Sequence, residues 1–351
     1  MIKTPSFWNN RGVASTALLP LTFVWQGLAA LRGLIAKTSA VSLPVICIGN
    51  ITVGGTGKTP LVGLLYDALI EHGHRPAILT RGYGGSETGP LWVDGTIHEA
   101  SACGDEPLML AENRDVLVSR DRAAGAQTIG NRGIHDVILM DDGMQNPFLE
   151  KNLKIGVFDG GVGVGNGRVV PSGPLREPKN AGIAALDIII INGDDETNLK
   201  ATLPADTPCY EGRIEPDQSV IESLADTSLL AFAGIGRPQR FFATLRRSGA
   251  TLAHYLAFAD HHPYSQSDLT KLQADALHYG AQLITTQKDW MRLPSDWRDK
   301  IAFLPVTMDL PEQDALVAHI IACIEEAAGT TDSAAELSQP KPTPIGQADN
   351  G

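Results

Sequence analysis

A glycine-rich segment that ends in Lys58 and Thr59 carries the clearest chemical signal in the sequence. The backbone N–H groups of such a segment can face a chain of phosphates, and the lysine adds a positive charge. The Thr59 hydroxyl is a ligand that Mg²⁺ accepts. The helix that the next residues predict would direct its positive end toward the same anion. We interpret the segment as a P-loop, with a plain glycine-rich turn as the alternative.

The P-loop interpretation predicts a set of nucleotide-binding residues and contains one departure from the usual motif. The set is Thr52, Val53, Gly54, Gly55, Thr56, Gly57, Lys58 and Thr59. Thr52 stands where the motif ordinarily has its leading glycine. The apolar run before the loop and the helical pattern after it are the context that a P-loop needs. The sequence therefore predicts that a nucleoside triphosphate binds here.

Acidic residues follow a second apolar run farther along the chain. Residues 137–140 are Val-Ile-Leu-Met, and Asp141 and Asp142 come directly after them. A carboxylate at the end of such a strand can hold Mg²⁺ directly or through water. An aspartate at a strand end can also simply cap the next turn, but the presence of a P-loop favours the metal site.

Asp105 lies in the sequence Gly-Asp-Glu-Pro, where two roles compete. Its carboxylate could accept a backbone N–H as the N-cap of a helix. It could instead act as a general base, if an attacking hydroxyl came within hydrogen-bond distance. The residues by themselves favour the cap.

Several other side chains could contact phosphate, metal or a carboxylate. In the loop of residues 171–178, Arg176 could offset phosphate charge and Glu177 could bind a metal. The alternative for these two is a surface ion pair worth at most about 1 kcal/mol. Arg122 could clamp a phosphate or cap the following helix, and both roles stay open. His261 and His262 are chain neighbours that rarely bind one metal together, which favours a histidine that orients a carboxylate across a cleft.

The pattern from residue 43 onward predicts the elements that must position these groups. Short β-rich runs alternate with helical stretches, which indicates an α/β fold whose parallel sheet is covered on both faces. The expected strands of this part are 43–49, 76–80, 116–119, 137–140, 153–158 and 187–191. A second alternation predicts strands 229–233, 253–258, 282–286 and 301–306 and helices 238–248, 265–279 and 312–327. Ligands bind at the carboxyl ends of parallel strands, which is where the P-loop lies.

These patterns divide the chain into five segments. We expect a membrane-associating helix in residues 1–40, a P-loop domain in 41–195 and a connection in 196–227. A smaller α/β domain is expected in 228–328. Residues 329–351 are rich in Thr, Ser, Pro, Gln and Gly, which predicts a disordered tail.

The composition excludes some classes of function. The 351 residues are 43% hydrophobic and 19% charged, as in a globular protein. A net charge of −12 argues against nucleic acid as a partner, because that affinity comes from clustered lysine and arginine. The four cysteines form no metal-binding pattern, and we expect them to stay reduced in a cytosolic setting. We also expect a monomer.

The N-terminal segment is basic and apolar, with no Asp or Glu before Asp67. Apolar residues recur at three- and four-residue steps between Leu21 and Ile35, which predicts an amphipathic helix. A helix that lies in the headgroup region of a membrane is favoured. A core-packing helix and a spanning or signal segment are the alternatives, although Pro20 and Gln26 weaken the spanning one.

Taken together, the motifs resemble those of one protein family. They are Thr52–Thr59, Arg81–Gly84, Gly104–Pro107, Asp141–Gln145, Gly173–Glu177 and Asp260–His262, in that order. The set resembles the tetraacyldisaccharide 4′-kinases, the lipid A 4′-kinases of Gram-negative bacteria. The resemblance runs from the N-terminal apolar helix to about residue 327.

The resemblance implies a role for each candidate residue. It makes Asp105 the base for the sugar 4′-hydroxyl, paired with His261, and so reverses the N-cap preference. The residues implied in catalysis are Asp105, His261, Lys58, Asp142, Arg122 and Arg176. Those implied at Mg²⁺ are Thr59, Asp141 and Glu177, while Gln145 lies near the nucleotide and Tyr83 toward the substrate.

The implied activity is transfer of the ATP γ-phosphate to a tetraacyldisaccharide 1-phosphate, which forms lipid IV-A. The implied partners are ATP, Mg²⁺, this acylated lipid and the cytoplasmic face of the bacterial inner membrane. Two alternatives remain from the residues: a P-loop ATP-dependent ligase or carboxylase, and a non-catalytic membrane-bound nucleotide switch.

Overall fold

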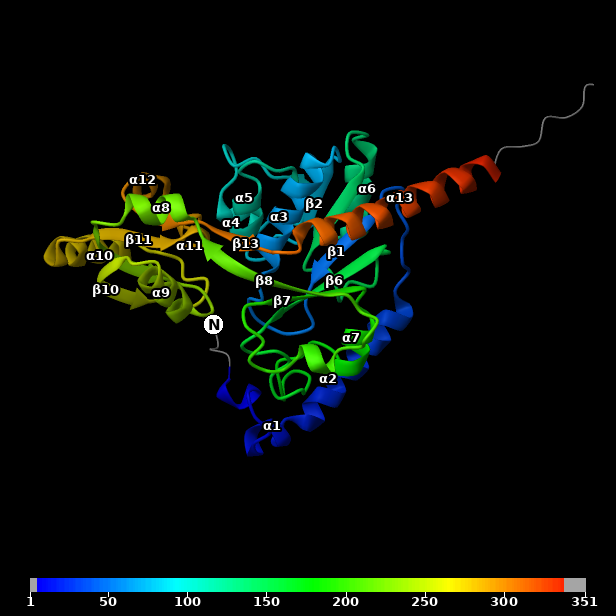
Figure 1. Ribbon diagram of the computed structural model, residues 1–351, viewed down its shortest axis with the longest axis horizontal. Coiled ribbons are helices and arrows are strands. Elements are labelled where there is room, and N and C mark those ends of the chain that lie inside the picture. Colours follow the sequence, from blue (N-terminus) through cyan, green and yellow to red (C-terminus); the bar gives the residue numbers. More distant parts are fainter. Residues whose placement is uncertain (1–4, 338–351) are drawn as a thin grey trace, which may run out of the picture.

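The protein folds into two α/β units that lie side by side and are linked by two strands (Figure 1). A computed structural model describes residues 5–337. The larger unit contains a nine-stranded sheet and the smaller one a four-stranded sheet. The α/β class and the two sheets were both predicted from the alternation of strands and helices.

The large sheet has the order β13-β8-β7-β6-β1-β5-β2-β4-β3. Its strands are β1 (Val45–Gly49), β2 (Pro76–Thr80), β3 (Leu91–Trp92), β4 (Val116–Val118), β5 (Val137–Asp141), β6 (Leu153–Asp159), β7 (Ile188–Asn192), β8 (Cys209–Pro216) and β13 (Val306–Asp309). The strands from β8 to β4 are parallel, and β13 and β3 are antiparallel edges. The carboxyl ends of β6, β1, β5 and β2 therefore meet at one edge of the sheet.

Helices cover both faces of the large sheet because its strands are apolar on both sides. Ile46 and Ile48 pack under α3 (Lys58–Glu71) and α13 (Gln313–Leu337). Val45 and Cys47 face the other way, toward α6 (Arg122–Asn131). On that second face α7 (Lys179–Ala184) covers β6 and β7. The core thus holds the body of the P-loop helix α3, while the start of the helix, where phosphate would bind, lies outside the core.

The small sheet is parallel throughout and also has two covered faces. Its order is β10 (Thr251–Ala257), β9 (Ser228–Ala233), β11 (Gln282–Thr286) and β12 (Ala302–Leu304). One face packs against α8 (Gln218–Ser223) and α9 (Pro238–Arg247). The other packs against α10 (Gln266–Tyr279) and α12 (Ser295–Arg298). The short helices that face the large unit are α4 (Ala100–Cys103), α5 (Asp105–Leu110) and α11 (Gln287–Trp290).

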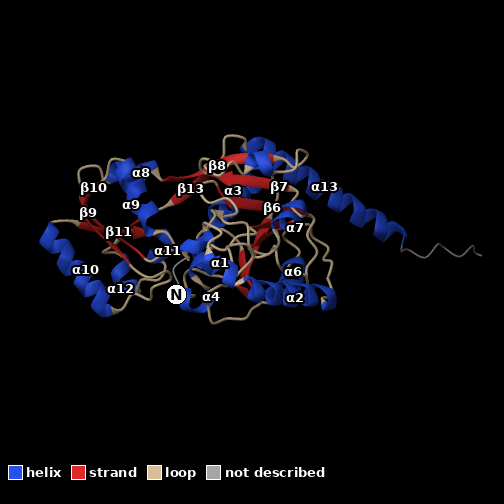
Figure 2. Ribbon diagram, turned by 90° about the horizontal axis from the view of Figure 1, so that it is seen from below, coloured by secondary structure: helices blue, strands red, loops and turns tan. Residues whose placement is uncertain are grey.

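The N-terminal helices lie along an edge of the large unit (Figure 2). After the 3₁₀ turn Ser6–Trp8 come α1 (Val13–Ala17) and α2 (Leu19–Ile35). Buried hydroxyls fasten them, since Ser15 and Thr22 both donate hydrogen bonds to Ser172. Most of the apolar face of α2 remains exposed to solvent. Among the described residues, no helix has the length and apolarity that crossing a bilayer requires.

Two of the domain boundaries were wrong. β8 lies in the expected connection and β13 in the expected small domain, yet the two strands pair with each other within the large sheet. Pro305 has no N–H, and it separates β12 from β13 where one strand was expected. α13 then returns to α3 in the large unit and continues to Leu337, so residues 329–337 are helical rather than disordered. The rest of the expected tail lies outside the described residues.

Candidate functional site

The glycine-rich loop connects β1 to α3 as a P-loop does. Gly54 and Gly57 have φ of 124° and 99°, in the region that favours glycine. A Cβ on Gly57 would lie 2.7 Å from Nδ2 of Asn192. Asn192 ends β7, and its Nδ2 donates to the Thr56 carbonyl at 3.0 Å. The loop conformation therefore depends on glycine at position 57 and on a side chain from a distant strand.

Thr52 replaces the usual leading glycine because its backbone lies beside another segment in an extended pairing. Thr52 forms an antiparallel bridge with Leu175. On either side of it, the Val53 N–H donates to the Pro174 carbonyl at 2.8 Å and the Arg176 N–H to the Ile51 carbonyl at 2.7 Å. Any residue can adopt such a conformation. The pairing also fixes the Arg176 loop against the P-loop, two segments more than one hundred residues apart.

A charged group lies at the start of α3. Lys58 Nζ is 3.8 Å from Asp142 Oδ1, and Arg176 contacts both Asp142 oxygens at 3.0 and 3.3 Å. Gln145 connects the group to Glu177, since its Nε2 donates to Oε1 at 2.8 Å. Burial opposes the ionisation of Asp142, but Lys58 and Arg176 lower its pKa below the usual value. Arg176 thus pairs with Asp142 and not with its neighbour Glu177.

Asp141, at the end of β5, is buried and is the best placed of the expected metal ligands. Its Oδ1 has no hydrogen-bond partner within residues 5–337. Burial, together with the charges of Glu106 and Asp142, raises the pKa of Asp141 to about 7. A cation would stabilise the ionised form, so the orphaned oxygen fits a Mg²⁺ ligand.

Arg122 is buried beside Asp141, at the first position of α6. Its Nη2 donates to the Asp141 carbonyl at 3.5 Å, and Nη1 donates to the Ser119 carbonyl. Burial lowers its pKa to about 10. Asp121, not Arg122, caps α6 by accepting the Ala124 N–H. Asp121 therefore fills the capping role, and the phosphate clamp is the role that stays open for Arg122.

Asp105 lies where the large unit contacts the small unit. It is the first residue of α5, whose N-cap is Gly104, and its Oδ1 accepts the Glu106 N–H at 2.9 Å. The expected partner His261 is close, with Nδ1 3.4 Å from Asp105 Oδ2. The Tyr83 ring lies edge-on to the His261 ring, with centroids 5.5 Å apart. Asp105, His261 and Tyr83, far apart in the sequence, are thus brought together.

Three charged residues of the small unit that the sequence reasoning missed also lie here. Arg292 donates to Asp105 from Nε at 2.7 Å and from Nη2. Lys288 Nζ donates to Glu106 Oε1 at 2.7 Å, and Asp289 is fully buried beside Arg292. A signal was present, because a charged run follows the strand β11 at its carboxyl end, where parallel sheets bind ligands.

A second contact between the units lies at the end of β6. Asp159 is 2% exposed, and Arg237 Nη1 and Arg240 Nη2 contact its oxygens at 2.8 and 2.9 Å. Both arginines belong to the small unit, Arg240 in α9. Because β6 neighbours β1, this contact lies on the other side of the P-loop from Asp141.

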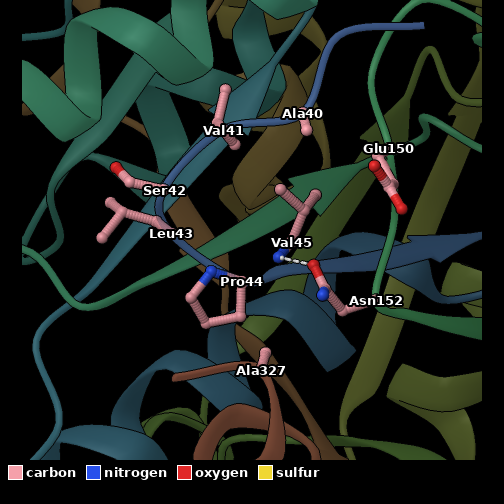
Figure 3. A pocket seen from close by; sticks show the side chains of 9 residues that line it. All are labelled: Ala40, Val41, Ser42, Leu43, Pro44, Val45, Glu150, Asn152 and Ala327. Atoms are coloured by element: carbon pink, nitrogen blue, oxygen red, sulfur yellow. Dashed lines mark hydrogen bonds between the residues drawn. The ribbon is translucent and has the colours of Figure 1, made fainter. Parts of the chain in front are cut away.

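Some expected partners are not in contact. No hydrogen bond joins Thr59, Asp141 and Glu177 to one another, and no three His, Cys, Asp or Glu of the described part of the chain are grouped as a ready metal site. A cavity of about 120 Å³ lies elsewhere, lined by residues such as Pro44 and Asn152 (Figure 3). It adjoins Val45, at the amino end of β1, so it is not the nucleotide site.

The fold and the loop define a two-domain protein of the P-loop class, whose phosphate-binding end faces a second domain. Comparison with a crystal structure of LpxK from Aquifex aeolicus in complex with ATP supports the fold. The TM-score is 0.73 at 24% identity, covering 88% of this chain and 99% of that one.

Sequence comparison identifies the family. The family described as tetraacyldisaccharide-1-P 4′-kinase matches residues 14–325. A tetraacyldisaccharide 4′-kinase of a Bradyrhizobium species is 44% identical over 92% of this chain and 96% of its own. One from Rhodospirillum rubrum is 42% identical over 91% and 97%. The chain belongs to the tetraacyldisaccharide-1-P 4′-kinase family, as its motifs predicted.

Proposed function

We propose that this protein transfers the γ-phosphoryl group of ATP to the 4′-hydroxyl of a tetraacyldisaccharide 1-phosphate, which forms lipid IV-A. The observation that carries the proposal is a family match that continues through residues 14–325. It spans the P-loop, Asp105 and His261, so both the donor and the acceptor side of the site are included. The ligase, carboxylase and non-catalytic switch alternatives do not agree with membership of a kinase family.

On the donor side, the P-loop N–H groups would bind the β- and γ-phosphates, and Lys58 and Arg176 would offset their charge. Until ATP binds, Asp142 would hold the side chains of Lys58 and Arg176 where the γ-phosphate is to lie. Gln145 would lie beside the nucleotide, and its bonds to Glu177 and to the Asn50 carbonyl would hold it there. Because phosphoryl transfer has a loose transition state, positioning and charge neutralisation supply most of the acceleration.

Mg²⁺ fits the donor side through the orphaned Oδ1 of Asp141. Thr59 and Glu177 are the further ligands that we propose, with phosphate oxygens completing the shell, as Mg²⁺ often prefers. Bound Mg²⁺ would neutralise charge on the β- and γ-phosphates. Arg122, whose Nη2 donates to the backbone carbonyl of Asp141, would offset charge on the phosphates.

On the acceptor side, Asp105 accepts the proton of the 4′-hydroxyl as that oxygen attacks the γ-phosphorus. His261 and Asp105 come from different units, so the site is complete only when the units are together. This arrangement would exclude water and limit hydrolysis of ATP without transfer. Tyr83 is 61% exposed beside His261, where it can meet the sugar.

The location that we propose is the cytoplasmic face of the bacterial inner membrane. Exposed apolar side chains cluster on the N-terminal helices, and they are Val13, Leu21, Phe23, Val24, Trp25, Leu28, Leu31, Leu34 and Ile35. Such a patch suits the interface of a bilayer. The acylated substrate resides in the same interface.

The test is incubation of the protein with γ-labelled ATP, Mg²⁺ and the disaccharide 1-phosphate in detergent. Label in the lipid, lost when the 4′-hydroxyl is blocked, is the expected result. ATP hydrolysis without labelled lipid would overturn the proposal.

A further inference from the structure

We infer that Arg292, from the small unit, is the residue that positions Asp105 for proton transfer. This inference rests on the proposed function. It assigns a positioning role to a residue that none of the motifs in the sequence contains.

The contact between Arg292 and Asp105 is direct and buried. Arg292 Nε and Nη2 both donate to Asp105 Oδ2, and the two side chains are 9% and 5% exposed. These two donors occupy both lone pairs of Oδ2. Among the described residues, Oδ1 accepts only the Glu106 N–H, which leaves one lone pair free for a substrate hydroxyl. Arg292 thus determines which carboxylate oxygen can act as the base.

Arg292 can impose this orientation because it is itself held rigidly. Its Nη1 donates to Asp289 Oδ1 at 2.9 Å and to the Gly234 carbonyl at 3.0 Å. Asp289 is fully buried and also accepts from the Tyr264 hydroxyl and the Gly234 N–H, each at 3.0 Å. Because Nη1 of Arg292 is already held by these bonds, the guanidinium loses little further conformational freedom when it contacts Asp105.

His261 supports Arg292 in this arrangement. Arg292 Nη2 lies 3.0 Å from His261 Nδ1. His261 Nδ1 also lies 3.4 Å from Asp105 Oδ2, so His261 contacts both members of the Arg292–Asp105 pair. Its backbone, at φ 56°, places the ring there, and its N–H donates to the Gly234 carbonyl at 2.9 Å. The same carbonyl accepts from Arg292, so the three groups form one unit.

The charges around Asp105 keep it ionised. Burial favours the neutral acid, but His261, Lys288 and Arg292 outweigh it and hold the pKa of Asp105 well below its usual range. Glu106 on α5, whose charge Lys288 offsets, and the buried Cys103 thiol, whose pKa burial raises, also lie beside it. A base with so low a pKa accepts the proton late in the reaction, after most of the bond change at phosphorus, and a loose transition state allows this.

The experiment compares the pH dependence of kcat/KM in the wild type, Arg292→Gln and Arg292→Lys. Without the cation the pKa of Asp105 rises, so the ascending limb should move to higher pH by about 1 to 3 units. We expect kcat to fall about 10- to 100-fold at neutral pH, with KM for ATP unchanged. The Arg292→Lys variant keeps the positive charge, so its ascending limb should lie close to that of the wild type. Its kcat should remain clearly below the wild-type value, because lysine lacks the two-pronged geometry of the guanidinium.

Arg247→Gln, an exposed change on α9, is the matched control and should behave as wild type. An unshifted limb in both Arg292 variants, with kcat within about twofold of wild type, would overturn the inference. If the glutamine variant does not fold, the lysine variant decides, because unchanged kcat there refutes a positioning role. A wild-type protein without transfer would overturn the proposed function instead. The pKa of Asp105, followed by carboxyl-carbon NMR, would then still show whether Arg292 controls it.

Discussion

The donor and acceptor sides of the site are built in different ways. The donor side takes its side chains from a single sheet edge: the P-loop after β1, Asp141 and Asp142 after β5, and the Arg176 loop paired with Thr52. The acceptor side joins Asp105 of the large unit to Arg292 and His261 of the small one. One side is complete within a domain, and the other requires both domains.

The burial of the ion pairs follows this division. Asp142 is 39% exposed beside Lys58, where a phosphate must enter and exchange partners. Asp105 is 5% exposed and bonded to an arginine that is itself anchored. An exposed pair contributes little to stability, whereas a buried carboxylate left without its partner is costly. The ion pairs of the donor side can therefore exchange partners when phosphate binds. The ion pair of the acceptor side is rigid, and it forms only when the two domains are in contact.

Lys58→Ala should have the largest effect of the substitutions, and that effect should be confined to the donor side. Loss of the cation at the start of α3, beside Asp142, should lower kcat about 10³-fold and weaken ATP binding. Equilibrium nucleotide binding and the label-transfer assay measure the two effects. Lys271→Ala, an exposed change on α10, is the control. Unchanged ATP affinity would show that the loop does not bind the phosphates.

Asp105→Asn should separate the two sides most sharply. Transfer should fall by about 10²- to 10³-fold, the usual loss on removal of a general base, while ATP affinity stays within about twofold of wild type. If nucleotide binding fell in parallel with transfer, the donor side would not be independent of the acceptor side.

Asp141→Asn should act through the metal requirement. The amide is a weaker ligand than a carboxylate, so the Mg²⁺ concentration for half-maximal rate should rise about 10- to 100-fold. Titration of Mg²⁺ at saturating ATP measures this change. The same Mg²⁺ requirement as wild type would remove Asp141 from the ligand set.

Asp159→Asn tests whether the second contact between the units also supports the acceptor side. Its arginine partners are 39% and 54% exposed, so we expect a loss of only about 1 kcal/mol, or about fivefold in kcat/KM for the lipid. ATP affinity should not change. Asp194→Asn breaks the exposed pair with Arg213 and serves as the control. Equal effects of the two variants would mean that Asp159 does not hold the units together.

The smallest effect on transfer in detergent is expected from Leu28→Glu combined with Leu31→Glu on α2. Both side chains are more than half exposed, so the rate should stay within about twofold. Binding to anionic vesicles should fall more than about tenfold, because two leucines no longer enter the interface. Leu277→Glu, a change at an exposed leucine of α10, should leave vesicle binding intact. Undiminished binding of the double variant would place the membrane surface elsewhere.

The sequence by itself determined the class of fold, the P-loop, the acid pair after β5 and the N-terminal apolar helix. Each is encoded in consecutive residues: apolar runs that must be buried, glycines that permit positive φ, and a helix pattern that repeats every three to four residues. The family motifs carried the assignment of Asp105 and His261, which the local pattern of Asp105 alone had left as a cap.

Only the tertiary structure decided how the acceptor side is built and where the domains divide. Arg292 meets Asp105 across 187 positions of sequence, and β13 returns to the large sheet to pair with β8. The charged run after β11 marks Arg292 as a candidate site residue but does not name Asp105 as its partner, and nothing around residue 306 indicates β8, because pairing across a sheet edge or a domain boundary depends on how complete surfaces pack. Local propensity sets the elements, while the burial of whole faces selects which charged ends come together.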